Sequence, residues 1–186
     1  PDQVPKHREP LYTTRRDLVE RFPTWDDFDS IMRLPTMYKT IQDRDNTGEY
    51  PMILTSGRLV EYEGGGEETR SMSWLAELQQ EMFVEINPAD ANDLSIKDGD
   101  DVWVEGAEGG RVKVKALVTP RVDRNVAFMP FHFGGMFQGE SLRDRYPDGS
   151  DPYIIGEAAN TATTYGYDPV TLMQETKCTI CRIERA

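Results

Sequence analysis

The sequence contains few of the side chains from which metal centres are usually built. Its 186 residues include two cysteines and two histidines, His7 and His132. Cys178 and Cys181 form one Cys-x-x-Cys motif, whereas a structural zinc site usually needs a second ligand pair and an iron–sulfur cluster typically needs four thiolates. The motif also lies in a segment of strand composition, which would place the two thiols on opposite faces of a strand. We therefore predict ordinary strand cysteines and no metal site.

Basic residues are also scarce. Lys and Arg number 21 against 33 Asp and Glu, so the net charge is −12. Nucleic acids select basic surfaces, so we expect no nucleic-acid partner. An anionic ligand would have to be bound by a local cluster of donors within an acidic field. There is no run of about 18 apolar residues, so no segment is expected to insert in a membrane.

The beginning of the chain has neither a starting Met nor the basic and apolar regions of a signal peptide. We expect an excised fragment, a processed subunit or an expression product. Residues 1–49 are rich in proline and charge but have few periodic apolar positions, so they are predicted to form an extended arm that packs on another body.

From residue 50 onward, short apolar strands alternate with turns. Five or six such strands with only short helices between them predict a mainly β fold, a small closed β-barrel. The long run 130–176 has little periodicity, and runs of this kind are often functional. Periodicity also predicts four core residues. The strands are expected at 52–54, 83–87, 102–105, 111–118, 126–129 and 178–183, the helices at 73–80 (with Ser73 as its cap) and 88–94, and the core residues are Trp103, Val112, Val114 and Phe128.

Two places in the sequence favour binding of a large anionic ligand. Leu54-Thr55-Ser56-Gly57-Arg58 ends an apolar strand in a tight turn, which offers backbone N–H groups, a hydroxyl and a guanidinium, as a phosphate requires. Far downstream, Asn160 can both donate and accept, as the edge of a purine or pterin requires, and Lys177 adds a positive charge.

Taken in order, these motifs resemble the C-terminal domain of molybdopterin-dependent oxidoreductases of the dimethyl sulfoxide reductase superfamily. The acidic glycine loop and the Thr-Thr-Tyr-Gly-Tyr run are similar to the formate dehydrogenase large (alpha) subunit in particular. The runs that carry the resemblance are 54–58, 61–71, 83–91, 98–100, 130–133, 160–169 and 175–177.

The resemblance implies a six-stranded double-psi β-barrel over residues 50–186 that closes on bis(molybdopterin guanine dinucleotide) with Mo or W. It implies an enzyme that oxidises formate to carbon dioxide and passes two electrons to iron–sulfur clusters. In such enzymes the metal ligand, the catalytic His and Arg, and the cluster ligands lie in upstream domains, so this chain alone is expected to be inactive. The implied partners are the rest of the large subunit and an iron–sulfur electron-transfer subunit. The implied compartment is the periplasm, with the cytoplasm as the alternative.

The resemblance also implies a set of cofactor-binding residues. The turn at Ser56, Gly57 and Arg58 would meet the dinucleotide, against the alternative of a plain β-turn with a solvated arginine. His132 would lie near the pterin, against the alternative of a core histidine with its bonds satisfied. In the loop from Glu61, acids and glycines replace the superfamily's commoner His-Trp-His-Thr pattern, so a surface loop is the alternative there. The remaining expected residues are Thr69, Arg70, Ser71, Phe133, Asn160, Tyr167, Gln174 and Lys177.

Two other functions remain compatible with the sequence. One is a non-catalytic double-psi barrel that serves for interaction, because a fold does not fix a function. The other is the same domain of an enzyme acting on nitrate or another oxyanion.

Overall fold

The computed structural model describes residues 46–163, 177 and 179–186. The predictions for the arm (nearly all of it), for Tyr167 and Gln174, and for Cys178 lie outside these residues. The boundary of the barrel domain at residue 50 stays a prediction.

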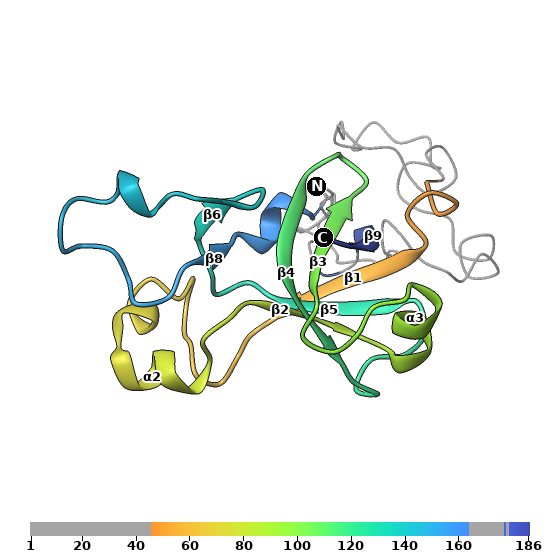
Figure 1. Ribbon diagram of the computed structural model, residues 1–186, viewed down its shortest axis with the longest axis horizontal. Coiled ribbons are helices and arrows are strands. Elements are labelled where there is room, and N and C mark those ends of the chain that lie inside the picture. Colours follow the sequence, from red (N-terminus) through yellow and green to blue (C-terminus); the bar gives the residue numbers. More distant parts are fainter. Residues whose placement is uncertain (1–45, 164–176, 178) are drawn as a thin grey trace, which may run out of the picture.

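Six strands form a closed barrel in the order β1-β5-β2-β4-β3-β9 (Figure 1). The pairs β1/β5 and β2/β4 are parallel, and the other neighbours are antiparallel. The prediction of a mainly β, six-stranded double-psi barrel is therefore confirmed. The strands are β1 (Met52–Gly57), β2 (Phe83–Ile86), β3 (Asp101–Gly106), β4 (Arg111–Val118), β5 (Val126–Pro130) and β9 (Thr179–Arg185).

Two short helices connect the strands close to the predicted positions. α3 (Pro88–Asp93) begins with Pro88, and the Asn87 side chain caps it by accepting a 3.0 Å hydrogen bond from the Ala89 N–H. α2 (Ser73–Leu78) differs in its start: Ser73 is its first helical residue, and the cap position is Met72, without a side-chain cap. The prediction of Ser73 as cap was wrong.

Alternating aliphatic residues fill the barrel. Val102, Val104 and Val112 are fully buried, and Val114 is nearly so. The predicted core positions Val112 and Val114 are confirmed. Trp103 and Phe128 are only half-buried, because neighbours with smaller side chains take the inward positions and strand alternation turns the aromatic rings outward. Their prediction as core residues was wrong.

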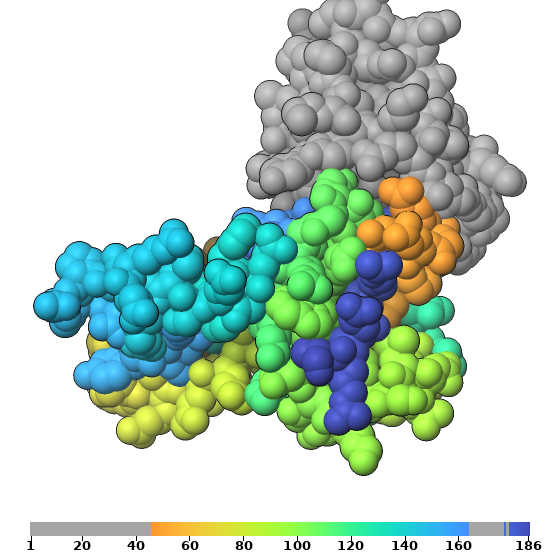
Figure 2. All heavy atoms as spheres, turned by 45° about the horizontal axis from the view of Figure 1, so that its top comes forward, coloured from red at the N-terminus to blue at the C-terminus, as the bar shows by residue number. Residues whose placement is uncertain are grey.

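Residues 134–158, here called the lobe, form a second small sheet in the order β7-β6-β8, beside the barrel (Figure 1). Its strands are very short, which explains why the sequence shows no periodicity there. Both views place the lobe next to α2 and the β3–β4 hairpin (Figure 2). Its elements are β6 (Gly135–Phe137), β7 (Glu140–Ser141), η3 (Arg143–Arg145) and β8 (Gly156–Glu157), and two further 3-10 turns are η2 (Thr69–Ser71) and η4 (Ala159–Thr161).

Candidate functional site

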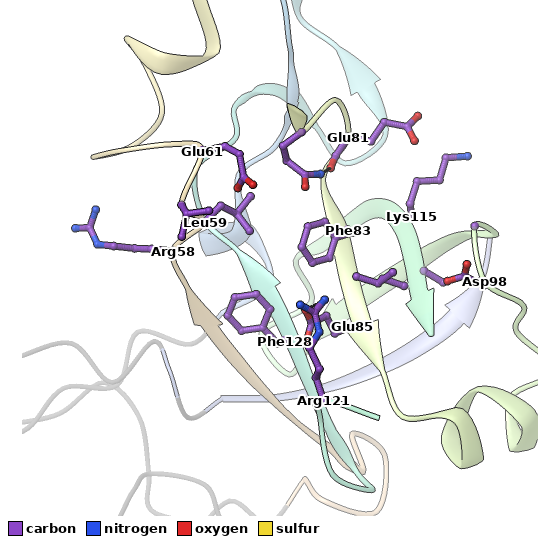
Figure 3. A pocket seen from close by; sticks show the side chains of 15 residues that line it. Arg58, Leu59, Glu61, Glu81, Phe83, Glu85, Asp98, Lys115, Arg121 and Phe128 are labelled. Atoms are coloured by element: carbon purple, nitrogen blue, oxygen red, sulfur yellow. Dashed lines mark hydrogen bonds and ion pairs between the residues drawn. The ribbon is translucent and has the colours of Figure 1, made fainter. Parts of the chain in front are cut away.

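A cleft of about 850 Å³ lies along the outer face of β5, β2 and β4 (Figure 3). It begins at the carboxyl end of β1, where Arg58 and Glu61 line it. These are two of the residues predicted from the sequence. The other lining residues are Leu59, Val60, Gln79, Glu81, Phe83, Glu85, Asp98, Gly99, Lys115, Ala116, Leu117, Arg121 and Phe128.

The cleft floor consists of the outward positions of barrel strands. Phe83 and Glu85 alternate along β2 with the core residues Val84 and Ile86, and Glu85 pairs with Phe128 of β5. The same alternation that turned Phe128 away from the core therefore places it under the cleft. Phe83 and Phe128 give the floor an aromatic surface.

Two of the three cations around the cleft are neutralised by neighbouring carboxylates. Arg121 Nη2 lies 2.6 Å from Glu85 Oε1, and Lys115 Nζ lies 2.9 Å from Asp101 Oδ1. The hydrogen bond between the latter two raises the pKa of Lys115 and lowers that of Asp101. Neither cation is therefore disposed to bind a second anion.

Arg58 differs from these two cations. It is exposed, and its guanidinium lies over the Phe131 ring at 5.3 Å from the centroid. Within the described residues, no carboxylate lies at ion-pair distance from it. Arg58 thus offers a positive charge and planar donors at the cleft end, next to the carboxyl end of β1.

Ser56 and Gly57 shape the turn through their backbone contacts. The Ser56 side chain is buried, and its hydroxyl donates to the Met129 carbonyl at 2.8 Å. At Gly57 an added Cβ would lie 2.8 Å from Phe128 Cε2, so a larger residue there would displace the Phe128 ring. Direct contact of either residue with a ligand stays a prediction.

His132 stabilises the chain after this turn through both of its ring nitrogens. It is fully buried; its Nε2 accepts from the Leu59 N–H at 2.9 Å, and its Nδ1 lies 3.0 Å from the Gly64 carbonyl. These two bonds require a neutral ring protonated on Nδ1. Burial lowers the pKa of His132, which favours the same neutral form. The geometry matches the alternative of a core histidine, and cofactor contact stays a prediction. Phe133 is likewise buried, edge-on to Tyr62 at 5.6 Å.

Arg70 is a buried cation bound to backbone carbonyls. Its Nε donates to Gly66 at 3.1 Å, and its Nη1 donates to Gly134 at 2.9 Å and to Ile154 at 3.2 Å. The side chain thus joins the loop before α2 to the lobe. Of its nitrogens only Nη2 has no such bond to the described residues, so the predicted phosphate contact would rest on Nη2.

Of the other predicted residues in the described ranges, Thr69 is half-buried and Ser71, Asn160 and Lys177 are exposed. Thr69 Oγ1 accepts from the Glu63 N–H at 3.4 Å, while Ser71 and Asn160 are exposed on η2 and η4. Lys177 is exposed two residues before Thr179, which pairs with Leu54. Two residues span about 7 Å at most, so Lys177 lies near the carboxyl end of β1.

Asn160 is brought to the same end of the barrel by the β3–β4 hairpin. Gly106 of β3 pairs with Cys181 of β9, and the hairpin tip continues from there toward the start of β9. η4 rests against this tip: a Cβ on Gly110 would lie 1.9 Å from the Thr161 carbonyl. The separate predictions at Arg58, Asn160 and Lys177 therefore converge on the end of the barrel at which β1 finishes.

The structure also contains site residues that the sequence did not indicate. Arg121 and Phe83 line the cleft, but an exposed arginine and a strand phenylalanine have no distinguishing pattern. Cys181 is fully buried, and burial raises the pKa of its thiol to about 12, so it is an inert strand residue as predicted. In the described part of the chain, no group of three or more His, Cys, Asp or Glu side chains is placed to hold a metal ion.

None of the helices in the described ranges has the length and apolar character needed to cross a membrane.

Only one end of the cleft suits an anionic cofactor. Its ionisable lining comprises three cations (Arg58, Lys115, Arg121) and four carboxylates (Glu61, Glu81, Glu85, Asp98), a formal sum of 3 − 4 = −1. The cleft as a whole therefore does not attract a polyanion. The β1 end, with Arg58 over Phe131, Lys177 nearby and Asn160 on η4, has the donor chemistry that a phosphate and a heterocycle edge require.

Known proteins are similar to this chain in sequence. The chain is 34% identical over 137 residues to the F420-dependent formate dehydrogenase 2 subunit alpha of Methanococcus maripaludis, covering 74% of this chain and 17% of that protein. It is 32% identical over 139 residues to the formate dehydrogenase 2 subunit alpha (cytochrome c-553) of Nitratidesulfovibrio vulgaris, covering 74% of this chain and 13% of that protein. The chain thus spans less than a fifth of the length of these relatives.

A solved structure and a family model agree with this. Acetylene hydratase from Pelobacter acetylenicus shares the fold, with a TM-score of 0.60 at 17% identity over 82% of this chain and 21% of that chain. A family described as the molydopterin dinucleotide binding domain matches residues 52–180, which include the whole barrel except most of its last strand. The chain therefore belongs to the molydopterin dinucleotide binding domain family, within the dimethyl sulfoxide reductase superfamily.

Proposed function

We propose that this chain is the cofactor-binding C-terminal domain of a formate dehydrogenase catalytic subunit. The complete enzyme would oxidise formate to carbon dioxide and pass two electrons to iron–sulfur clusters. The names of two relatives, both formate dehydrogenase alpha subunits at 34% and 32% identity, support this substrate. The other parts of the large subunit and an iron–sulfur subunit would supply the reacting centre and the electron path.

The cofactor would be bis(molybdopterin guanine dinucleotide) with Mo or W, and it would supply the redox chemistry. Arg58 and Lys177 would bind its anionic groups, and Asn160 would meet a heterocycle edge. Ser56, Gly57 and His132 would hold the turn that presents Arg58. Thr69, Ser71 and Arg70 Nη2 would add donors from η2. The proposed set is completed by Glu61, Phe133, Tyr167 and Gln174.

One observation carries this assignment. Arg58 is the cation of the cleft that no described carboxylate neutralises, whereas Arg121 and Lys115 in the same cleft are paired. An exposed guanidinium without a carboxylate partner among the described residues, in a chain of net charge −12, suits an anion brought from outside.

The test is the metal, pterin and guanine nucleotide content of the native complex isolated through this chain. We expect Mo or W with about two guanine nucleotides per metal, as a bis(dinucleotide) cofactor requires. Arg58→Ala in the full enzyme should lower pterin content and formate oxidation together. Arg145→Ala, an exposed arginine of η3, is the matched control and should change neither.

Other outcomes would point to the alternatives. An intact complex without metal or pterin would favour an interaction barrel. A loaded complex that reduces nitrate and leaves formate unchanged would favour the function named for the assimilatory nitrate reductase catalytic subunit of Bacillus subtilis, which is 28% identical over 106 residues. A periplasmic location is proposed on the resemblance alone, and cell fractionation tests it.

A further inference from the structure

Glu157 is a buried carboxylate whose charge is met by backbone amides. It is 0% exposed, at the end of β8. One oxygen accepts from the Lys113 N–H at 3.3 Å and from the Gly139 N–H, and the other accepts from the Gln138 N–H at 3.0 Å. Within the described ranges no basic side chain forms an ion pair with it. A charge in this setting is stable only while these amides stay in place.

The turn that supplies two of these amides directs both of them at the Glu157 carboxylate. Gln138 and Gly139 both have positive φ, 51° and 88°, in the two-residue turn between β6 and β7. Successive N–H groups in such turns can form a concave site for a negative charge. Gly139 has a second requirement, since a Cβ there would lie 2.6 Å from Trp103. Glu157 therefore fastens the β6–β7 turn and β4 to β8.

Asn160 follows Glu157 by three residues. Between them the chain enters η4, and after Asn160 it rests on the hairpin, where the Thr161 and Ala162 carbonyls approach Gly110 and Gly106 too closely for any Cβ. The segment 157–162 is thus fixed at its beginning by a charge and at its end by two glycine contacts. Asn160 is the exposed residue between these two anchors.

We propose that Glu157 is a positioning residue for cofactor binding: it sets the place of η4, and thereby directs the Asn160 side chain toward the cofactor edge. This inference rests on the proposed function, because it gives Asn160 its ligand. Glu157 then affects cofactor binding only through Asn160 and does not contact the cofactor itself.

A double-mutant cycle in the full loaded enzyme tests this dependence. The variants are Glu157→Gln, Asn160→Ala and the pair together, and the readout is the rate of pterin release during dialysis. We expect each single variant to release pterin about threefold to tenfold faster, the range of one lost hydrogen bond. The double variant should release it no faster than Asn160→Ala alone, because Glu157 acts through Asn160.

Two results would overturn the inference in distinguishable ways. Effects that multiply in the double variant would show that Glu157 acts independently, as a merely structural residue would, while Asn160 still binds the cofactor. An unchanged release rate in Asn160→Ala would remove Asn160 from the site and with it this part of the proposed function.

Glu140→Gln is the matched control, since Glu140 is an exposed carboxylate of β7 in the same lobe, and its release rate should equal that of the wild type. If Glu157→Gln does not accumulate as folded protein, Glu157→Asp enters the same cycle. It keeps the charge and shortens its reach by one methylene.

Discussion

The barrel is stabilised by buried aliphatic side chains, whereas the lobe beside it is held by two buried charges that bind backbone groups. In the barrel, residues such as Leu54 and Val104 are completely buried among other apolar side chains. Glu157 of the lobe binds three backbone amides, and Arg70 of η2 binds the lobe carbonyls of Gly134 and Ile154 together with that of Gly66. The two charges take opposite kinds of backbone group, so neither needs the other as an ion-pair partner.

The difference has consequences for function. Apolar contacts are non-directional and tolerate small shifts. Hydrogen bonds to a charge fix distance and angle, and an unpaired buried charge is costly. The barrel therefore provides stability, while the charges of the lobe and of the loop before α2 set where the candidate binding residues lie.

The largest expected effect is the loss of barrel stability when a buried aliphatic side chain is truncated. Leu54→Ala removes a fully buried side chain from β1, and such truncations lower the free energy of unfolding by about 2–5 kcal/mol. Urea denaturation of the chain should show this loss in one transition. Val60→Ala, at a residue that is 98% exposed, is the control and should leave the midpoint unchanged. Equal midpoints for both variants would contradict the apolar account of the barrel.

A smaller effect should break the lobe alone. Arg70→Met keeps a long apolar stem and removes the side-chain bonds to the carbonyls of Gly66, Gly134 and Ile154. The first two carbonyls keep one backbone donor each, the N–H groups of residue 70 and of Gly156. We expect a local loss of about 2–3 kcal/mol, the range for bonds to a charged group. Hydrogen exchange should accelerate at the Gly156 amide of the lobe and stay slow at Val104 of the barrel. Uniform acceleration would show that lobe and barrel unfold together.

Acid should loosen the loop that His132 braces. Burial holds the pKa of His132 below its ordinary 6.5, so the unfolded chain takes up a proton at higher pH than the folded chain does. The free energy of unfolding should therefore fall as the pH drops from 6.5 toward the folded pKa, and be unaffected above 6.5. The His132→Gln variant should lack this pH dependence. At neutral pH it should be less stable by about 1 kcal/mol, because its bonds to Leu59 and Gly64 are weaker. Thermal unfolding as a function of pH measures both effects. A persistent slope in that variant would assign it to another group, and His7→Gln is the control.

The smallest expected effect concerns the contact between the barrel and the lobe. Arg111 lies over the Trp103 ring at 4.1 Å, and Trp103 packs on Gly139 of the lobe. Arg111→Ala should cost about 0.5–1 kcal/mol, the usual value of an exposed cation–π contact. Tryptophan fluorescence during thermal unfolding measures it. A loss several times larger would mean that Arg111 stabilises the lobe contact as well.

The barrel could be predicted from the sequence because its signals are local. Alternation in β3 and β4, the glycine turn between them and the Asn87-Pro88 start of α3 each specify their own element. The inward face was misassigned at Trp103 and Phe128 because alternation shows which residues share a face of a strand but not which face is turned inward. Once Val102 and Val104 face inward, Trp103 must face outward.

The site was predictable in part. The binding chemistry of Arg58 and Asn160 can be predicted from residue type and order, but the burial of a side chain cannot. Nothing in the sequence distinguishes Arg70, whose side chain donates hydrogen bonds to backbone carbonyls, from an arginine whose donors are available to bind phosphate. Glu157 gave no signal at all, since its three amide partners come from 44 residues away on β4 and from 18 and 19 residues away in the β6–β7 turn.

The pairing of the last strand bears on how the protein is made. β9 closes the barrel between β1 and β3, and Thr179 lies 125 residues after its partner Leu54. At a synthesis rate of about 5–20 residues per second, the β1 edge waits about 6–25 s on the ribosome for this strand. During that interval the β1 edge, and the β3 edge once residues 101–106 have been made, are open to pairing with other chains. The nascent chain is therefore most exposed to aggregation just before β9 is made, which is the period when a chaperone would protect it best.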